Sequence, residues 1–456
     1  MAVQLQSTLL GLEGQFLSSL IGNQAFCRVM GRYSPSSHAY AISPWVLSLW
    51  AGVFGLGQII GQLVTASLAD RWGRRFALYF TLFCVYVGVA VELASGSHND
   101  FTGAKILMGF ASGALQAAVP TFVSEVAPSE ARGFFIGLAA FALSFGSLVG
   151  SLALYAADKR YSEDNLGWRI PLAVGLAAPT VSLVLQLFLL PESPAWLVVR
   201  GRMVEARASL AWLYPTLTDR QLDEQLDLLV YTVQREEVKT SFLHCFDQSN
   251  RRRTFVSLFP QVAGNFTGTQ LVGSYTTYFF EKAGLKSALR SNVIVTCLGL
   301  AGTILAFFVV DNKRVGRLTL ILVGVIVSSL TMLGVGLIET ASHGSISQQA
   351  GYGAVFLIAL YNFTSSMGPG VAGISYVGES SALRLRAKTA AVALATNVLV
   401  GTVCNVVLPY LIDALHMKSG YVFFGFGVVC TVIVVLYIPD LTGRSYAEID
   451  DLFKHT

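Results

Sequence analysis

Two ionisable residues, Glu13 and Lys105, lie within stretches of the sequence that are otherwise apolar. A charged side chain at membrane depth is costly and is a functional candidate for that reason. The carboxyl group of Glu13 can bind and release a proton, whereas Lys105 offers a positive charge. The first apolar stretch is short, however, so an interfacial position for Glu13 is the alternative. A proton site at Glu13 is therefore the first chemical hypothesis.

A second group of residues carries amides and phenols that can bind hydroxyl groups. Asn265 and Gln270 can each donate and accept hydrogen bonds. The wider set of substrate-binding candidates is Asn265, Gln270, Tyr275, Tyr278, Asn362 and Tyr376. The alternative role of a polar residue in a membrane helix is to join neighbouring helices. We favour that alternative for each of these residues taken singly, except Asn265 and Gln270.

The composition is that of a membrane protein. Of the 456 residues 54% are hydrophobic and only 13% are charged, against about 25% charged in soluble domains. The net charge of +4 is too small and dispersed to indicate a nucleic-acid partner. The six cysteines lack metal-ligand spacing, and no phosphate-binding Gly-rich loop or hydrolytic constellation is present. We expect no cofactor, no metal and no enzymatic activity.

The apolar stretches predict an all-α polytopic protein, because their residues do not alternate in polarity as barrel strands do. Each stretch is long enough to cross the bilayer as a helix. Few residues precede Gly11, so we expect the first helix to be truncated. The twelve predicted spans are 4–27, 45–69, 76–97, 101–124, 133–156, 168–190, 254–280, 289–310, 317–339, 350–377, 388–413 and 420–439.

The spans fall into two sets of six. We expect one six-helix bundle in residues 1–190, a linker with short amphipathic helices in 191–253, a second bundle in 254–440 and a tail in 441–456. Lys and Arg concentrate in the loops on one side, which predicts cytoplasmic N- and C-termini. Related motifs follow corresponding spans: Glu125 to Arg132 follows the fourth, and Glu379 to Arg386 follows the tenth. Such repetition predicts alternating access around a central pathway.

The loop after the second span, Asp70-Arg71-Trp72-Gly73-Arg74-Arg75, resembles the signature loop of the major facilitator superfamily. PESPAWLVVRGR (191–202), WRIP (168–171) and PDLTGRSYAEIDDLF (439–453) resemble elements of its sugar porter family. The resemblance covers the whole chain and implies the major facilitator fold with twelve transmembrane helices. We expect charged residues of these motifs to pair and hold the cytoplasmic gate shut; their alternative role is only to mark the cytoplasmic side. The gating candidates are Asp70, Arg71, Arg74, Arg75, Glu125, Arg132, Glu192, Glu379, Arg384, Arg386 and Arg444.

Two stretches are similar to fungal α-glucoside (maltose) permeases, namely 268–284 and 405–427. Glu13 and Lys105 stand where proton-coupled sugar porters carry an Asp and an Arg, which implies that the pair links protonation to substrate binding. Other positions depart from the hexose carriers: Ser147 replaces a Gln, and Ile374 replaces a Trp. These losses weaken a hexose assignment.

The resemblance implies a secondary active transporter that moves a sugar or sugar-like solute, such as an α-glucoside, by proton symport. Its partners would be the solute, protons and the lipid bilayer, and we expect a monomer in the plasma membrane. One alternative is a carrier or exporter of a non-sugar secondary metabolite, which the replaced sugar-binding residues favour. Another is a sugar sensor that does not transport. The short segment after the last span argues against a sensor, because sensors carry long cytoplasmic tails.

Overall fold

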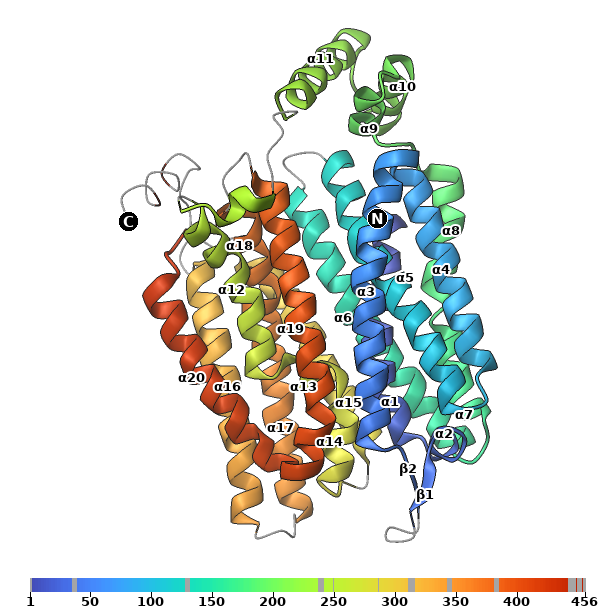
Figure 1. Ribbon diagram of the computed structural model, residues 1–456, viewed down its shortest axis with the longest axis vertical. Helices are drawn as coiled ribbons and strands as arrows, with labels where there is room; N and C mark the ends of the chain where they lie inside the picture. Colours follow the sequence, from blue (N-terminus) through green and yellow to red (C-terminus); the bar gives the residue numbers. More distant parts are fainter. Residues whose placement is uncertain are drawn as a thin grey trace.

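The protein is described from a computed structural model and is almost entirely helical (Figure 1). The structure describes residues 2–34, 39–127, 132–236, 242–248, 250–285, 287–310, 316–342, 347–380, 385–441, 448 and 453.

The first part of the chain contains eight α-helices, two 3₁₀ turns and a small hairpin among its described residues. They are η1 (Ala2–Gln6), α1 (Ser7–Ser19), η2 (Leu20–Gly22), α2 (Gln24–Met30), β1 (Arg32–Ser34), β2 (Ala39–Ala41), α3 (Pro44–Trp72), α4 (Arg74–Ala94), α5 (His98–Val126), α6 (Arg132–Tyr161), α7 (Leu166–Val174) and α8 (Ala177–Leu189). The two strands pair antiparallel, with Tyr33 opposite Tyr40.

The linker and the second part follow. The linker helices are α9 (Pro194–Val199), α10 (Met203–Leu213), α11 (Asp219–Glu236) and the turn η3 (Phe242–Phe246). The second part has α12 (Arg251–Thr267), α13 (Thr269–Ser274), α14 (Thr276–Lys282), α15 (Ala288–Val309), α16 (Arg317–Ala341), α17 (Gln348–Ser365), the π-helical turn η4 (Ser366–Ala372), α18 (Gly373–Ser380), α19 (Arg386–Leu415), η6 (His416–Lys418) and α20 (Ser419–Tyr437).

The helices coincide with the predicted membrane spans. Within the described residues, nine stretches are long and apolar enough to cross a membrane, and the last of them, 388–437, holds both α19 and α20. The two predicted spans outside these stretches, 4–27 and 254–280, are built from shorter helices. The predicted all-α polytopic fold is therefore confirmed.

Small residues bring α3 and α5 into backbone contact. A β-carbon added at Gly113 would lie 1.9 Å from the carbonyl oxygen of Gln58, and one at Gly61 would lie 2.1 Å from that of Phe110. Such close approach is typical of membrane helices, because small residues let the helices make many van der Waals contacts. This packing fixes α5, which carries Lys105.

Two predicted spans are interrupted. The stretch 254–280 breaks at Gly268, whose φ of 110° lies in the left-handed region, where glycine is favoured. The stretch 350–377 widens into the π-helical turn η4, which contains Pro369. A proline has no N–H to donate and its ring clashes with the preceding turn, so Pro369 disfavours regular α-helical hydrogen bonding at this point. Both breaks lie inside predicted spans, and the sequence pattern that placed those spans did not indicate them.

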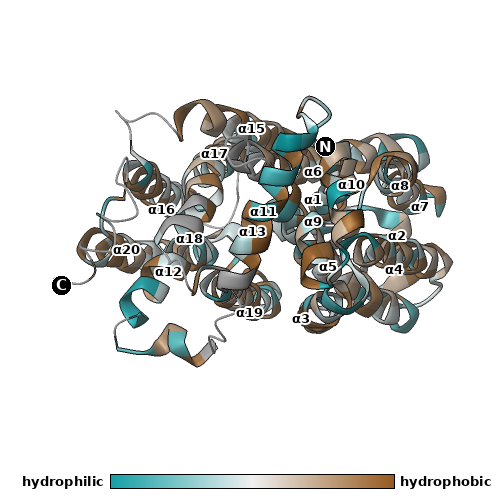
Figure 2. Cartoon of the chain, turned by 90° about the horizontal axis from the view of Figure 1, so that it is seen from above, coloured by the Kyte–Doolittle hydropathy of each residue, from teal (hydrophilic) through white to brown (hydrophobic). Residues whose placement is uncertain are grey.

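The outward faces of the helices are apolar. Phe188 of α8 is 81% exposed, Phe308 of α15 is 76% exposed, and Leu436 of α20 is 69% exposed. Hydrophobic residues also colour the periphery when the helices are seen end-on (Figure 2). Exposure of so much apolar surface to water is unfavourable, so these faces fit contact with lipid.

The linker helices α9, α10 and α11 lie at one end of the helices that span the membrane (Figure 1). Arg207 of α10 pairs with Asp219 and Asp223 of α11, at 2.9 and 2.7 Å. Helices thus form where the periodicity of the linker predicts them. The end that carries α9–α11 is called the linker end below, and the other end, with the β1–β2 hairpin, is called the hairpin end.

Candidate functional site

Three charged side chains meet inside the first group of helices. The Nζ atom of Lys105, on α5, lies 3.1 Å from Oε2 of Glu13 on α1 and 2.7 Å from Oε1 of Glu92 on α4. The side chains of Glu13 and Lys105 are 1% exposed, and that of Glu92 is 0% exposed. These three residues are called the charge triad below.

Aromatic rings cover one side of the charge triad. The Nζ atom of Lys105 lies 5.1 Å from the ring centroid of Phe101, a distance at which a cation is attracted to the face of a ring. Phe101 packs on Trp50 and Phe26, with ring centroids 4.8 and 5.3 Å apart, and Trp168 packs on Phe26. All four rings are almost completely buried. The packed rings therefore shield this side of the triad from water.

The structure brings Glu13 and Lys105 together and buries both side chains among the helices. Their part in proton coupling stays a prediction. Sequence reasoning missed Glu92, although it lies in the apolar stretch 76–97 and meets the criterion that singled out the other two residues. The signal that could have identified Glu92 was an acidic residue inside a predicted span, near its end.

Four amide side chains form a second polar cluster, between α12, α13 and α19. Asn265 donates to Oδ1 of Asn397 at 2.7 Å, Gln270 donates to Oδ1 of Asn265 at 2.8 Å, and Asn405 donates to Oε1 of Gln270 at 3.0 Å. This row is called the amide chain below. Asn397 and Asn405 were not predicted, because the sequence does not indicate which face of α19 meets α12.

The break at Gly268 makes the amide chain possible. In a continuous helix two residues five apart point in directions about 140° apart. Because α12 ends at Thr267 and α13 starts afresh at Thr269, the side chain of Gln270 turns back toward Asn265. The two amides thus act together.

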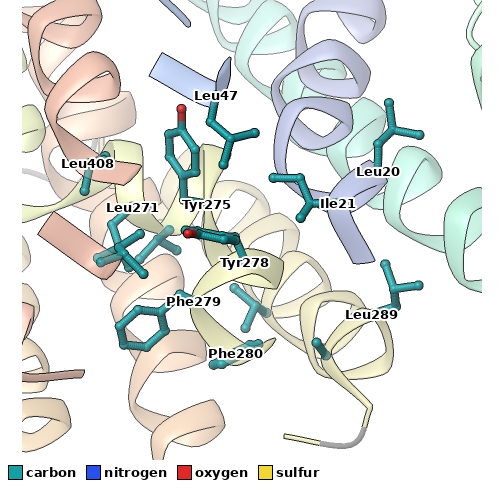
Figure 3. Packing of buried hydrophobic residues seen from close by; sticks show 14 of the residues in the cluster. Leu20, Ile21, Leu47, Leu271, Tyr275, Tyr278, Phe279, Phe280, Leu289 and Leu408 are labelled. Carbon is teal, nitrogen blue, oxygen red and sulfur yellow. The ribbon is translucent and has the colours of Figure 1, made fainter. Parts of the chain in front are cut away.

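The other substrate-binding candidates lie in different surroundings. Tyr275 donates its hydroxyl hydrogen to the backbone oxygen of Asn405 at 3.1 Å, beside the amide chain. Tyr278 lies in an apolar cluster with Leu271, Phe279 and Phe280 (Figure 3).

Two candidates bind the backbone of other segments, away from the amide chain. Asn362 donates to the backbone oxygen of Val295 at 3.0 Å, and Tyr376 donates to that of Pro439 at 3.1 Å. The interhelical role that was the alternative fits Asn362, whereas Tyr376 ties α18 to the segment after α20.

Hydrogen bonds join the two groups of helices toward the hairpin end. Gln15 on α1 donates to the backbone oxygen of Gly273 at 3.1 Å, and Asn292 on α15 donates to Gln15 at 2.9 Å and to Ser19 at 3.0 Å. Ser19 in turn shares a hydrogen bond of 3.1 Å with Thr277. These contacts tie α1 to α13, α14 and α15 at that end.

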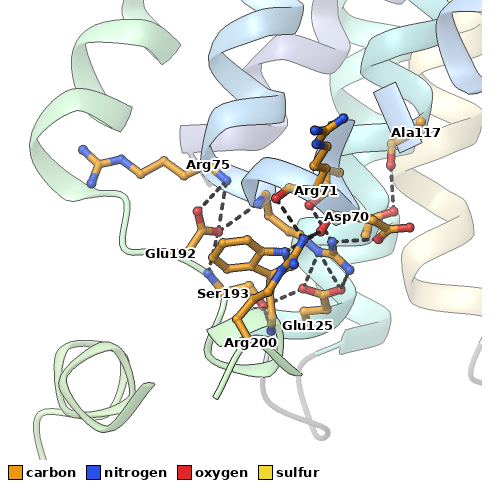
Figure 4. A network of polar contacts seen from close by, with 12 residues as sticks. Asp70, Arg71, Arg75, Ala117, Glu125, Glu192, Ser193 and Arg200 are labelled. Carbon is orange, nitrogen blue, oxygen red and sulfur yellow. Dashed lines mark hydrogen bonds and ion pairs between the residues drawn. The ribbon is translucent and has the colours of Figure 1, made fainter. Parts of the chain in front are cut away.

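A network of polar contacts occupies the linker end of α3, α4 and α5 (Figure 4). The guanidinium of Arg74 contacts Glu125 at 2.9 Å and Asp70 at 2.9 Å. Ser193 donates to Glu125 at 2.5 Å, and Arg200 donates to the backbone oxygens of Asp70 and Arg71, both at 2.9 Å. Glu125 thereby joins the start of α4 to the segment before α9.

Glu192 belongs to the same network through the backbone. Its carboxylate accepts hydrogen bonds from the N–H groups of Arg74, at 2.9 Å, and Arg75, at 3.1 Å. Gly73 has a φ of 105°, and a β-carbon there would lie 2.4 Å from Oε2 of Glu192. The expected pairing with an arginine side chain is thus replaced by binding at the start of a helix, where carboxylates are stabilised. The guanidinium of Arg75 instead donates to the hydroxyl of Tyr79 at 3.0 Å.

The remaining gating candidates are not described in the same detail. Arg384 and Arg444 lie outside the described residues. Arg132, Glu379 and Arg386 fall within helices, but their side chains are not among those described. Their pairing stays a prediction.

Known proteins resemble this chain over nearly its full length. The family model "Sugar (and other) transporter" matches residues 1–453. A general alpha-glucoside permease of Saccharomyces cerevisiae is 29% identical over 466 residues, covering 99% of this chain and 74% of that protein. A maltose permease of the same species is 27% identical, covering 97% of this chain and 73% of that protein.

Solved structures share the fold. The xylose transporter XylE from E. coli, in an inward-open conformation, has a TM-score of 0.77 and covers 99% of this chain and 98% of its own, at 19% identity. The same symporter bound to 6-bromo-6-deoxy-D-glucose has a TM-score of 0.74 at 20% identity, covering 99% of this chain and 98% of its own. The expected major facilitator fold is thereby confirmed.

Proposed function

This chain belongs to the family of sugar and other transporters, and from that premise we propose that it carries an α-glucoside or similar sugar across a membrane by alternating access, in symport with protons. The observation that supports a sugar substrate best is the amide chain of Asn397, Asn265, Gln270 and Asn405. Relatives named as alpha-glucoside and maltose permeases support the substrate class.

The amide chain suits a ligand with many hydroxyl groups. Each amide both donates and accepts, so a sugar hydroxyl can replace an amide partner without leaving a buried group unpaired. Oδ1 of Asn405 is buried and has no hydrogen-bond partner among the described residues, so it can accept from such a hydroxyl. Tyr275, bound to the backbone of Asn405, adds an aromatic ring nearby.

A carrier of a non-sugar metabolite is the second candidate. It is favoured by Ile374, which is 41% exposed on α18 where hexose carriers place a tryptophan. The experiment that separates the two is an uptake panel in cells that lack their own sugar carriers. We expect concentrative uptake of labelled maltose. Efflux of a non-sugar compound from loaded vesicles, without maltose uptake, would favour the second candidate, and sugar-dependent signalling without any uptake would favour a sensor.

In this proposal the coupled proton binds to Glu13, and Lys105 is the cation paired with it. Protonation of Glu13 removes its attraction to Lys105, and a bound solute then favours one of the two open states more than the other. The contacts around Gln15, Ser19 and Asn292 would have to break for the hairpin end to open.

We place the linker on the cytoplasmic side and the protein in the plasma membrane. In a cysteine-free background, Glu224→Cys on α11 is expected to react with a membrane-impermeant maleimide only after the cells are permeabilised. Glu163→Cys, in the exposed turn between α6 and α7, should react in intact cells. Labelling of position 224 in intact cells would reverse the proposed topology.

Glu125 is expected to act in the cytoplasmic gate. Glu125→Arg removes the partner of Arg74 and of Ser193, so transport should slow roughly tenfold, as expected for a lost charge-assisted hydrogen bond. Membrane insertion should be unchanged, because Glu125 lies in the last turn of α5, at the charged linker end of the helices. The matched control is Glu205→Arg, in an exposed pair with Arg202. Restored transport in the double variant Glu125→Arg, Arg74→Glu would support pairing of the two side chains. Normal uptake in Glu125→Arg alone would show that these charges only mark the cytoplasmic side.

A further inference from the structure

Glu92 is a second acid beside a lysine that already has an acidic partner. Its Oε1 lies 2.7 Å from Nζ of Lys105, closer than the carboxylate of Glu13 at 3.1 Å. With all three groups ionised, the charge triad carries a net charge of minus one. Buried charges that are not balanced are strongly unfavourable, so this excess needs an explanation.

No other charged group balances the triad within the part of the chain that the structure describes. The charged groups acting on Lys105 there are Glu13 and Glu92. Asp100, at the start of α5, is exposed and accepts a hydrogen bond from Ser97, while the guanidinium of Arg169 on α7 lies 5.0 Å from the ring centroid of Trp168. The remaining described charges on α3 to α6 lie toward helix ends, at 70–75, Glu125 and 158–160.

We propose that Glu92 is a positioning residue of the proton site, which balances Lys105 so that Glu13 can take up a proton without leaving a buried positive charge. The proposal rests on the proposed proton symport. Oε1 of Glu13 and both carboxylate oxygens of Glu92 are buried and have no hydrogen-bond partner among the described residues. Glu92 lies nearer to Nζ of Lys105, at 2.7 Å against 3.1 Å, so we assign the proton to Glu13, the acid that is farther from the cation.

The net charge of the triad determines whether replacement of Glu92 makes proton binding to Glu13 stronger or weaker. When Glu92 is present, protonation of Glu13 changes the net charge from minus one to zero. When Glu92 is replaced by glutamine, the same protonation changes it from zero to plus one. Because a buried net charge is costly, the wild-type site binds the proton more readily than the variant does. A purely structural role for Glu92 would predict no such difference.

The test is the pH dependence of solute accumulation. A proton symporter accumulates solute when its site is protonated, and accumulation falls as the pH rises through a midpoint. In Glu92→Gln this midpoint should move to lower pH by roughly one to three units. Glu92→Asp keeps the charge but moves it away from Nζ, so its midpoint should lie between the two. Lys105→Ala should move the midpoint to higher pH, because the acids lose the cation that favours their charged forms.

The variants are compared at equal amounts in the membrane, with Glu224→Gln on the exposed face of α11 as the control. If wild type accumulates solute without any pH dependence, the proposed proton symport is wrong, and this inference fails with it. If wild type is pH-dependent but Glu92→Gln keeps its midpoint at a lower rate, only the role of Glu92 is wrong. Should Glu92→Gln not reach the membrane, an unshifted midpoint in Glu92→Asp would overturn the inference.

Discussion

Glu13→Gln is expected to abolish accumulation of the solute against a gradient while exchange of the solute across the membrane continues. Glutamine resembles a permanently protonated carboxyl and cannot release a proton. The substitution leaves Lys105 paired with Glu92 at 2.7 Å, so the triad becomes neutral, which favours correct folding. The carrier should therefore still open to both sides but no longer draw on the proton gradient.

The measurement is uptake of labelled solute with and without a protonophore, together with exchange in preloaded vesicles. Wild type should accumulate solute only without the protonophore, whereas Glu13→Gln should reach the external concentration in both conditions. Glu13→Asp should keep partial coupling. Concentrative, protonophore-sensitive uptake by Glu13→Gln would show that the proton binds elsewhere.

Gln270→Ala is expected to raise the solute concentration for half-maximal uptake by roughly ten- to hundredfold. Gln270 links Asn265 and Asn405 in the amide chain, and its removal takes the hydrogen-bond partner from Oδ1 of Asn265, from the amide N–H of Asn405 and from a solute hydroxyl. An unpaired buried polar group costs about 1–3 kcal/mol. Asn405→Ala removes the hydrogen bond between Asn405 and Gln270 and should also raise the solute concentration for half-maximal uptake.

The control for Gln270→Ala is Gln348→Ala, which removes an exposed glutamine at the start of α17 that donates to Tyr352. Its half-saturation should equal that of wild type. Uptake kinetics at several solute concentrations separate a binding effect from a loss of protein in the membrane, because the latter lowers only the maximal rate. A change of less than about twofold in Gln270→Ala would remove this residue from the binding site.

The course of the helices could be predicted from the sequence because the bilayer imposes a length and an apolar composition on every span. The same rule identified Glu13 and Lys105 as exceptions. It applied equally to Glu92, which was overlooked near the end of a span.

Contacts between distant helices could not be predicted in this way. Asn397 and Asn405 lie over 100 residues from Asn265, and a periodic pattern does not tell which faces meet. The break at Gly268 also reorients Gln270, which a continuous helix would direct elsewhere. Similarly, Glu192 binds backbone N–H groups that are exposed only because α4 starts after Gly73.

The central claim is that a proton gradient drives this protein to accumulate a sugar. The most direct test is wild-type protein in sealed vesicles with an imposed pH gradient and labelled maltose outside. Maltose should accumulate above its external concentration when the outside is acidic, and the accumulation should collapse when a protonophore is added. Maltose that only equilibrates at every imposed gradient would contradict proton symport, and vesicles that exclude maltose would contradict the proposed substrate.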